Sequence, residues 1–341
     1  MKNIKIIILT LFWASVSLAQ DMHFTHIDQA GQFINPAMLG SFEGDHRAIL
    51  NYKSQWASVI SPYKTMAVQY DGRFSGKRWN SDVLTFGASY VGDEAGEVSI
   101  QSKQFNLGVG YIKTLNKKHS ISAGFQIGWA SKGIDQTAAQ WDNQYDPSVQ
   151  GGYNSSLGSG ESAYYGNNFS YLDMNFGLLW RYTPFRNLGL VTGFSIYHIS
   201  PVELKYVDGN TDIMSRRWNA HMTLIRRIKG SNVTILPSVL FMNQGATRET
   251  LLGFKVRYAL DESSRHSGAV QDMYFEAGGQ YRLGDAFIFT LGYAWRNFQF
   301  RGGYALNTSN LSLATKGNGG FEVSLVYTTP FKRKYRGNTM Y

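Results

Sequence analysis

The chain has 341 residues, a formal net charge of +9 and no cysteine. The absence of cysteine excludes disulfides, thiolate metal sites and thiol catalysis. Its 21 tyrosines, 21 phenylalanines, 8 tryptophans and 36 glycines, set against 7 prolines and 17% charged residues, are typical of a protein built from many strands and turns.

Residues 1–19 predict a secretory signal peptide. Two lysines precede an apolar run that ends near Trp13, and small residues form a cleavage site at Ala19. The apolar run is shorter than the roughly 18 residues that a membrane anchor requires, so we expect cleavage after Ala19. For an exported chain, the positive charge favours contact with anionic lipid A or an acidic partner over binding of nucleic acid.

Residues 20–46 predict an irregular segment that leads into the first strand. Its apolar residues follow neither a helical nor a strand period for long, and Gly31, Pro36 and Gly40 interrupt it. From residue 47 onward, apolar and polar side chains alternate, as a strand between two media requires. An irregular segment therefore precedes an alternating strand.

Residues 47–328 predict a transmembrane antiparallel β-barrel. The alternation is clearest at 121–129, where Ile121, Phe125 and Trp129 share one face while serine, glycine and glutamine occupy the other. We count about fourteen strands of about 8 to 13 residues, an even number as in single-chain outer-membrane barrels. A soluble propeller would also alternate, but it would repeat a motif every 40 to 50 residues or so, and no such repeat occurs. We therefore expect an all-β outer-membrane barrel.

Two polar segments interrupt or follow this pattern. Residues 131–170 are rich in Gly, Ser, Asn, Asp and Tyr, and a loop of this length in a barrel is extracellular or folds into the lumen. Residues 329–341 form a basic C-terminal tail, which we place in the periplasm as a solvated tail or as a docking peptide for a periplasmic partner. Residues 20–46 are expected on the periplasmic side of the first strand, where they can enter and close the lumen.

Candidate catalytic and metal sites are weak. His23 and His26, with Asp21 and Asp28 nearby, suggest a metal cluster, but a third ligand at a fixed spacing is missing. The sequence at 193–197 lacks the second glycine of a nucleophile elbow, and no phosphate-binding loop motif occurs. We expect no enzymatic activity, no cofactor and no metal.

Several stretches taken together form an ordered set. The later ones are GFSIYHISPVELKY at 193–206, ILPSVLFMNQG at 235–245, YRLGDAFIFTLGY at 281–293 and NTSNLSLATKGNGGFEVSLVY at 307–327. The earlier residues of the set are Phe24, Asn35, Pro36, Gly40, Tyr52, Gln55, Trp56, Pro62 and Asp71. In this order they resemble the PorP/SprF family of outer-membrane proteins of the type IX secretion system. The resemblance marks the earlier residues as candidates for a plug and for partner contacts.

The resemblance implies a barrel of the fatty-acid-transporter-like type with a non-enzymatic role. It implies support for the secretion or cell-surface anchoring of cargo with C-terminal sorting domains, in some members linked to gliding motility. The implied partners are this cargo, periplasmic and outer-membrane secretion components, and outer-membrane lipid, with no nucleic acid. Two alternatives stay open: a passive channel or hydrophobic-solute transporter, and an adhesin-like barrel that uses the loop at 131–170.

Overall fold

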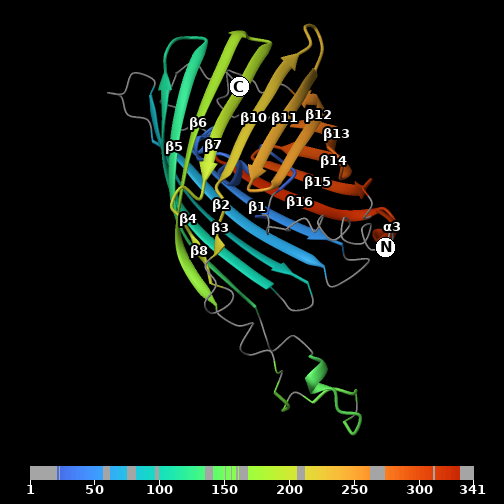
Figure 1. Ribbon diagram of the computed structural model, residues 1–341. Helices are drawn as coiled ribbons and strands as arrows, with labels where there is room; N and C mark the ends of the chain where they lie inside the picture. The colour runs from blue at the N-terminus through green and yellow to red at the C-terminus, as the bar shows by residue number, and fades with distance from the viewer. Residues whose placement is uncertain are drawn as a thin grey trace, which may run out of the picture.

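Fourteen antiparallel strands close into a barrel, which confirms the fold class expected from the sequence (Figure 1). The computed structural model describes residues 21–22, 24–56, 62–74, 82–96, 100–134, 141–149, 151–154, 156–158, 160, 168–205, 212–261, 273–309 and 312–330. The sheet closes where the first strand pairs with the last. None of the helices within these ranges is long and apolar enough to cross a membrane.

The barrel strands follow one another around the wall in chain order. They are β1 His46–Gln55, β2 Tyr63–Phe74, β3 Val83–Ala95, β4 Ile100–Thr114, β5 His119–Ile134, β6 Phe169–Phe185, β7 Leu188–Tyr197, β10 Arg217–Arg227, β11 Val233–Gln244, β12 Thr247–Asp261, β13 Met273–Arg282, β14 Ala286–Trp295, β15 Phe298–Asn307 and β16 Asn318–Thr328. A two-stranded sheet, β8 Glu203–Leu204 with β9 Asp212–Ile213, lies in the connection between β7 and β10.

Several strands are longer than the sequence pattern predicts. β6 has 17 residues and β5 has 16, beyond the expected upper limit. β5 therefore extends to Ile134 and β6 begins at Phe169, inside the range assigned to the long loop. The extra residues of β5 and β6 include Ser131, Lys132, Gly133 and Ser170, which interrupt the apolar alternation. Backbone pairing between the two strands nevertheless continues through Lys132 and Phe169, so the hydrogen-bonded ladder extends beyond the alternating pattern.

Side chains alternate between a lipid-facing and a lumenal side, as the sequence predicts. On β5, Ile121, Phe125 and Trp129 are exposed, whereas Ser122 and Gln126 are buried. An outward apolar band with a polar interior is what a barrel in a bilayer requires. The buried side of this wall is thus a polar surface that faces the lumen.

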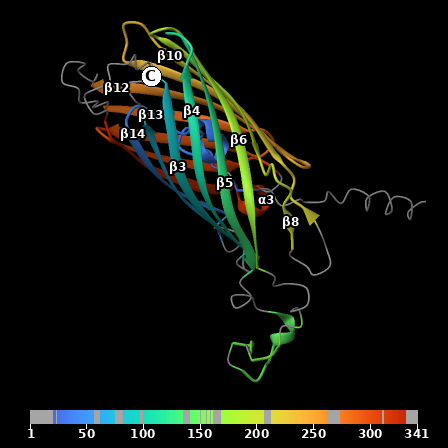
Figure 2. The same ribbon diagram turned by 90° about the vertical axis from the view of Figure 1, so that its left-hand side faces the viewer.

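The two ends of the barrel differ in their connections. At the terminal end β1 begins and β16 ends, and the amide of Thr329 donates to the carbonyl of His46 at 2.9 Å. The connection from β5 to β6 leaves from the opposite end, here called the loop end, and part of it projects far from the barrel (Figures 1 and 2). Because long loops of such barrels are extracellular and short turns periplasmic, we expect the loop end to face the cell surface.

The N-terminal segment, residues 21–22 and 24–45, runs through the lumen (Figure 2). The segment contains a short helix α2, Gly31–Ile34, and a 3-10 turn η1, Pro36–Met38. It reaches the loop end at Asp21, whose amide donates to Gln244 at 3.1 Å, and the terminal end at Asp45, whose amide donates to Thr329 at 3.2 Å. We expected it on the side where β1 begins, from where it could enter the lumen. It spans the barrel, because its first residues pair with loop-end side chains.

A row of lumenal glycines provides the space for this segment. A Cβ at Gly177 would lie 1.9 Å from the Asn35 amide oxygen, and one at Gly124 would lie 2.3 Å from the Pro36 carbonyl. Glycines in strand interiors often mark such a close approach of another backbone. We call this group of glycines, which leaves room for the segment on five neighbouring strands, the glycine seat: Gly87, Gly108, Gly124, Gly177 and Gly193.

The remaining contacts of the segment combine a small apolar cluster with polar contacts. Phe24, Ile27, Ala30 and Ile34 are buried against the wall. The wall residues in this cluster are Ala67, Val91, Leu240, Met242, Leu251 and Ile288. The segment is therefore packed as an internal element and not as a free leader.

Replacing Gly177 with alanine tests the seat. The new methyl group would overlap Asn35, and overpacking of a tight site costs about 1–3 kcal/mol, so we expect a lower melting temperature in detergent. Gly302→Ala is the matched control, because a Cβ there meets nothing within 4 Å. Equal melting temperatures for the two variants would contradict this packing.

Candidate functional site

Asn35 fixes the middle of the N-terminal segment to the wall. Its side-chain amide donates to the carbonyl of Leu178 at 3.0 Å and lies 3.2 Å from Nε2 of His221. Its side-chain oxygen accepts from the amide of Ala37 at 2.9 Å, which caps η1. Asn35 is fully buried, so these contacts satisfy an amide that has no access to water.

Asp71 forms an anchor near the terminal end. Its buried carboxylate accepts two hydrogen bonds from Arg47, at 2.9 and 2.7 Å, in a bidentate pair. It also accepts from the amide of Gly40 at 2.9 Å. Gly40 has a φ of 66°, a conformation that glycine adopts without strain. The carboxylate of β2 thus holds both the start of β1 and the end of the N-terminal segment.

Glu322 of β16 anchors the segment near its beginning. Its carboxylate accepts from the amide of Thr25 at 2.9 Å, from the Thr25 hydroxyl and from the amide of His26 at 3.3 Å. Burial lowers the pKa of His26 to about 4, so the ring is neutral at physiological pH. The carboxylate is therefore satisfied mainly by backbone and hydroxyl donors.

Asp28 pairs with two cations of the barrel wall, on β12 and β15. Its carboxylate lies 3.0 Å from Nζ of Lys255 and 2.8 Å from Nη1 of Arg301. Arg301 also lies 2.6 Å from the carboxylate of Glu276. Although burial alone would raise the pKa of Asp28, Arg301 and Lys255 hold it well below its usual value. Asp28 is ionised and completes a charge network across three strands.

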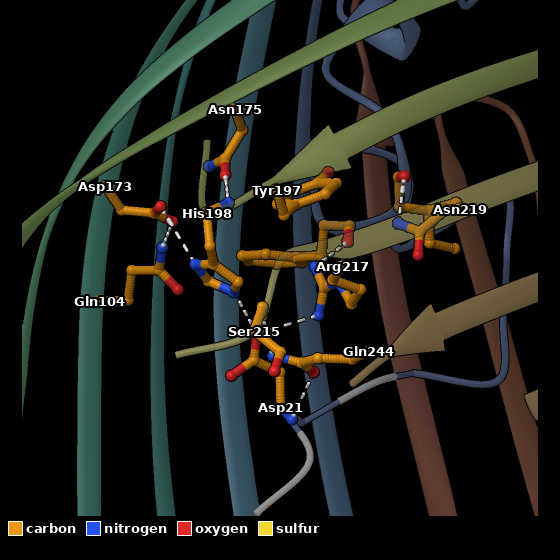
Figure 3. Close-up of polar contacts among 12 residues, drawn as sticks. Asp21, Gln104, Asp173, Asn175, Tyr197, His198, Ser215, Arg217, Asn219 and Gln244 are labelled. Carbon is orange, nitrogen blue, oxygen red and sulfur yellow. Dashed lines mark hydrogen bonds and ion pairs between the residues drawn. The ribbon is translucent and has the colours of Figure 1, made fainter. Parts of the chain in front are cut away.

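His198 and Asp21 form the loop-end anchor (Figure 3). Both ring nitrogens of His198 contact carboxylates: Nδ1 lies 3.0 Å from Asp173, and Nε2 is hydrogen-bonded to Asp21. The backbone amide of His198 donates to Asn175 at 3.1 Å, and its φ is 57°. A non-glycine residue in this region is strained and is held there by its surroundings.

Two further cations surround Asp21. Nη1 of Arg217 lies 3.5 Å and Nζ of Lys132 lies 3.7 Å from its carboxylate. The guanidinium of Arg217 also stacks over the ring of Tyr197 at 4.3 Å and donates to the carbonyl of Phe33 at 3.0 Å. Arg217 therefore links the first residue of the segment to α2.

The pKa values of the pair follow from this environment. Burial alone would lower the pKa of His198, but Asp21 and Asp173 raise it to about 9. Burial alone would raise the pKa of Asp21, but His198, Lys132 and Arg217 hold it well below the usual range. At neutral pH the anchor is an imidazolium between two carboxylates.

The structure separates the residues suggested by the sequence into two groups. Asn35, Pro36, Gly40 and Asp71 lie at the seat and the terminal anchor, and Phe24 is buried in the lumen. The second group lies toward the loop end: Tyr52 packs on Phe321, Gln55 lines a small lumenal cavity, Trp56 packs on Tyr63, and Pro62 precedes β2. A partner role for either group stays a prediction.

Sequence reasoning missed the loop-end anchor. Neither His198 nor Asp173 belongs to a recognisable site motif in the sequence. Asp21 and Asp28, which the sequence analysis considered beside His23 and His26 as a weak candidate for a metal cluster, pair with different parts of the wall. Within the described ranges no group of three metal-ligating side chains occurs, and His23 lies outside them.

Replacing Asp21 with asparagine tests the anchor. A folded pKa above the unfolded value near 6.5 means that protonated His198 contributes stability below pH 6.5, and that this contribution is lost as the pH rises through about 9. We expect Asp21→Asn to lower the pKa of His198 in an NMR titration and to flatten the decline of the melting temperature over this window. Asp142→Asn, in the projecting loop, is the control, and an unchanged His198 pKa in Asp21→Asn would contradict the pairing.

Comparison with solved structures finds proteins of similar fold. The toluene transporter TodX of P. putida shares 11% sequence identity over 89% of this chain and 94% of that chain, with a TM-score of 0.50. The TodX deltaS2 mutant, a monoaromatic hydrocarbon channel, gives a TM-score of 0.53 with the same identity and coverage. A Pseudomonas aeruginosa FadL homologue shares 10% identity over 86% of this chain and 92% of that chain, with a TM-score of 0.48. Identities this low show the fold alone, and the barrel fold is the one shared with TodX.

Comparison with sequences identifies the family. No curated protein matches the chain. Residues 16–327 match the family described as "Type IX secretion system membrane protein PorP/SprF". The match spans nearly the whole chain and agrees with an outer-membrane barrel closed by fourteen strands. The chain therefore belongs to the PorP/SprF family of type IX secretion system membrane proteins.

Proposed function

We propose that this barrel is a non-enzymatic accessory of type IX secretion that supports the secretion or surface anchoring of cargo with C-terminal sorting domains. The observation that carries the proposal is the N-terminal segment, which is held in the lumen by ion pairs of Asp21 and Asp28 and by the hydrogen bond from the Gly40 amide to Asp71. A barrel with an internally fixed segment suits a platform for other proteins better than an open conduit. Family membership supports the same role.

The anchors favour a segment that stays in place. Lys255, Arg301 and His198 are buried, and each pairs with a carboxylate of the segment as well as with one of the wall. Loss of a carboxylate beside a buried cation is unfavourable, because the charge of the cation is then less well compensated. Withdrawal of the segment would separate Asp28 from Lys255 and Arg301, and Asp21 from His198, at the same time. We infer that the segment closes the pore under resting conditions.

The proposed partners follow from the two ends of the barrel. The loop end carries the connection between β5 and β6, which projects from the barrel and offers a surface to secreted cargo (Figure 1). The terminal end offers short turns to periplasmic and outer-membrane secretion components. The basic tail was expected to be periplasmic, and residues 331–341 lie outside the described residues. The proposal includes a contribution to gliding motility, and the only support for that contribution is membership of the PorP/SprF family.

A passive channel or hydrophobic-solute transporter is the second candidate. The observation that favours it is the similarity of the fold to TodX, a toluene transporter. At 11% identity this similarity does not extend to substrate. The adhesin-like alternative depends only on the projecting loop.

Deletion of the gene tests the proposed role. We expect loss from the culture medium or from the cell surface of at least one protein with a C-terminal sorting domain, measured by surface labelling and mass spectrometry. Complementation with the intact gene is the control. Unchanged secretion and display of every such cargo would contradict the role.

Deletion of residues 21–44 tests closure of the pore. We expect a higher ion conductance in planar bilayers, because the polar lumen would then be open to water. The Gly302→Ala barrel, with its segment intact, is the control for insertion. A conductance equal to that of the control would mean that the segment does not close the pore, and uptake of toluene by the intact barrel would favour the transporter alternative.

A further inference from the structure

The terminal end of the barrel carries an uninterrupted group of cations. Three turns contribute to it: β4 to β5, β6 to β7, and β10 to β11. Residues 115–119, 183–188 and 226–233 contain no aspartate or glutamate. All the charged side chains that these turns expose are basic, and we call this group the basic rim: Lys117, Lys118, Arg186, Arg226, Arg227 and Lys229.

Hydrogen bonds join the three turns into one surface. The amide of Thr183 donates to the carbonyl of Lys118 at 2.8 Å, which connects the first turn to the second. The amide of Arg227 donates to the carbonyl of Asn187 at 3.0 Å, which connects the second to the third. The strands between them are neighbours in the wall. The cations are therefore held side by side by the backbone.

Each turn also exposes a large apolar side chain beside its cations. Leu115 is 54% exposed, Phe185 is 64% exposed and Ile228 is 44% exposed. An apolar side chain next to Lys or Arg is typical of the boundary between acyl chains and headgroups, where the apolar part is immersed and the cation extends to the phosphate. The same pairing on three successive turns argues for lipid over an acidic protein.

An aromatic cluster lies directly beside the rim. The rings of His119 and Tyr182 stack with centroids 4.5 Å apart, and Nε1 of Trp180 donates to Nδ1 of His119 at 3.3 Å. Tryptophan and tyrosine concentrate at the membrane interface of barrels. This cluster places the headgroup boundary at the level of Lys118, the residue before His119.

We propose that the basic rim is a binding surface for anionic phospholipid headgroups of the leaflet at the terminal end. The lipid phosphates pair with the cations of the three turns, and the acyl chains cover Leu115, Phe185 and Ile228. Clustered basic residues beside a membrane span recognise anionic lipids in this way. The inference goes beyond the proposed function and does not depend on it.

Native mass spectrometry of the full-length protein, titrated with phosphatidylglycerol and with phosphatidylcholine, tests the proposal. We expect the intact protein to prefer phosphatidylglycerol. Each cation contributes about fivefold in affinity for an anionic surface, so replacing five of them should weaken phosphatidylglycerol binding by at least about tenfold and leave phosphatidylcholine binding unchanged. The rim variant is Lys117→Gln, Lys118→Gln, Arg186→Gln, Arg226→Gln and Lys229→Gln.

A matched variant removes five exposed cations from the loop-end half: Lys64→Gln, Lys103→Gln, Arg216→Gln, Arg248→Gln and Lys316→Gln. It has the same net charge as the rim variant, and we expect it to retain the preference. Fluorescence quenching localises the lipid: brominated phosphatidylglycerol should quench the Trp180 component, defined by difference from Trp180→Phe, more than brominated phosphatidylcholine does. These measurements need only a folded barrel, which heat-dependent migration in SDS gels confirms.

Equal binding of the two lipids by the intact protein would overturn the proposal. So would a rim variant that keeps its preference, or a Trp180 signal that does not distinguish the two brominated lipids. Loss of an acidic periplasmic protein from the rim variant, with lipid binding unchanged, would assign the surface to a protein partner and reject the lipid.

Discussion

Charge pairing between the N-terminal segment and the wall is the constraint on which the rest of the structure depends. A polar lumen can hold a chain only if the charges on both sides are paired, because an isolated buried charge is costly. Asp21 and Asp28 bring negative charge to the wall cations, while Asp71 and Glu322 accept donors from the segment. The anchors lie at both ends of the lumen, so they fix the direction of the segment as well as its position.

The glycine seat complements these anchors by shape. Because one glycine on each of five neighbouring strands has no side chain, Asn35 and η1 can approach the backbone of the wall. The buried side-chain amide of Asn35 then donates a hydrogen bond to the wall backbone, at the carbonyl of Leu178. The segment and the wall therefore depend on each other: the seat has no other occupant within the described chain, and the segment has too few apolar residues to fold alone.

The sequence predicted the barrel well because alternation is local. Two-residue periodicity marks a lipid face whatever the distant parts of the chain do, as at Ile121 and Phe125. The seat was visible only in part, since Gly124 on the polar face of β5 read as ordinary strand pattern. The pairing of Asp21 with His198 was not predictable, because 177 residues separate them and only closure of the barrel brings them together. The same closure decides that the segment spans the lumen.

The central claim is that residues 24–45 are an internal part of the folded barrel. Hydrogen–deuterium exchange of the intact protein in detergent tests it most directly, because exchange reports local opening. The account predicts that amides of Asn35, Ala37 and Gly40, which lie in η1 or donate to buried acceptors, exchange as slowly as those in the middle of β5. Exchange of these amides as fast as in the projecting loop at residues 141–149 would contradict it.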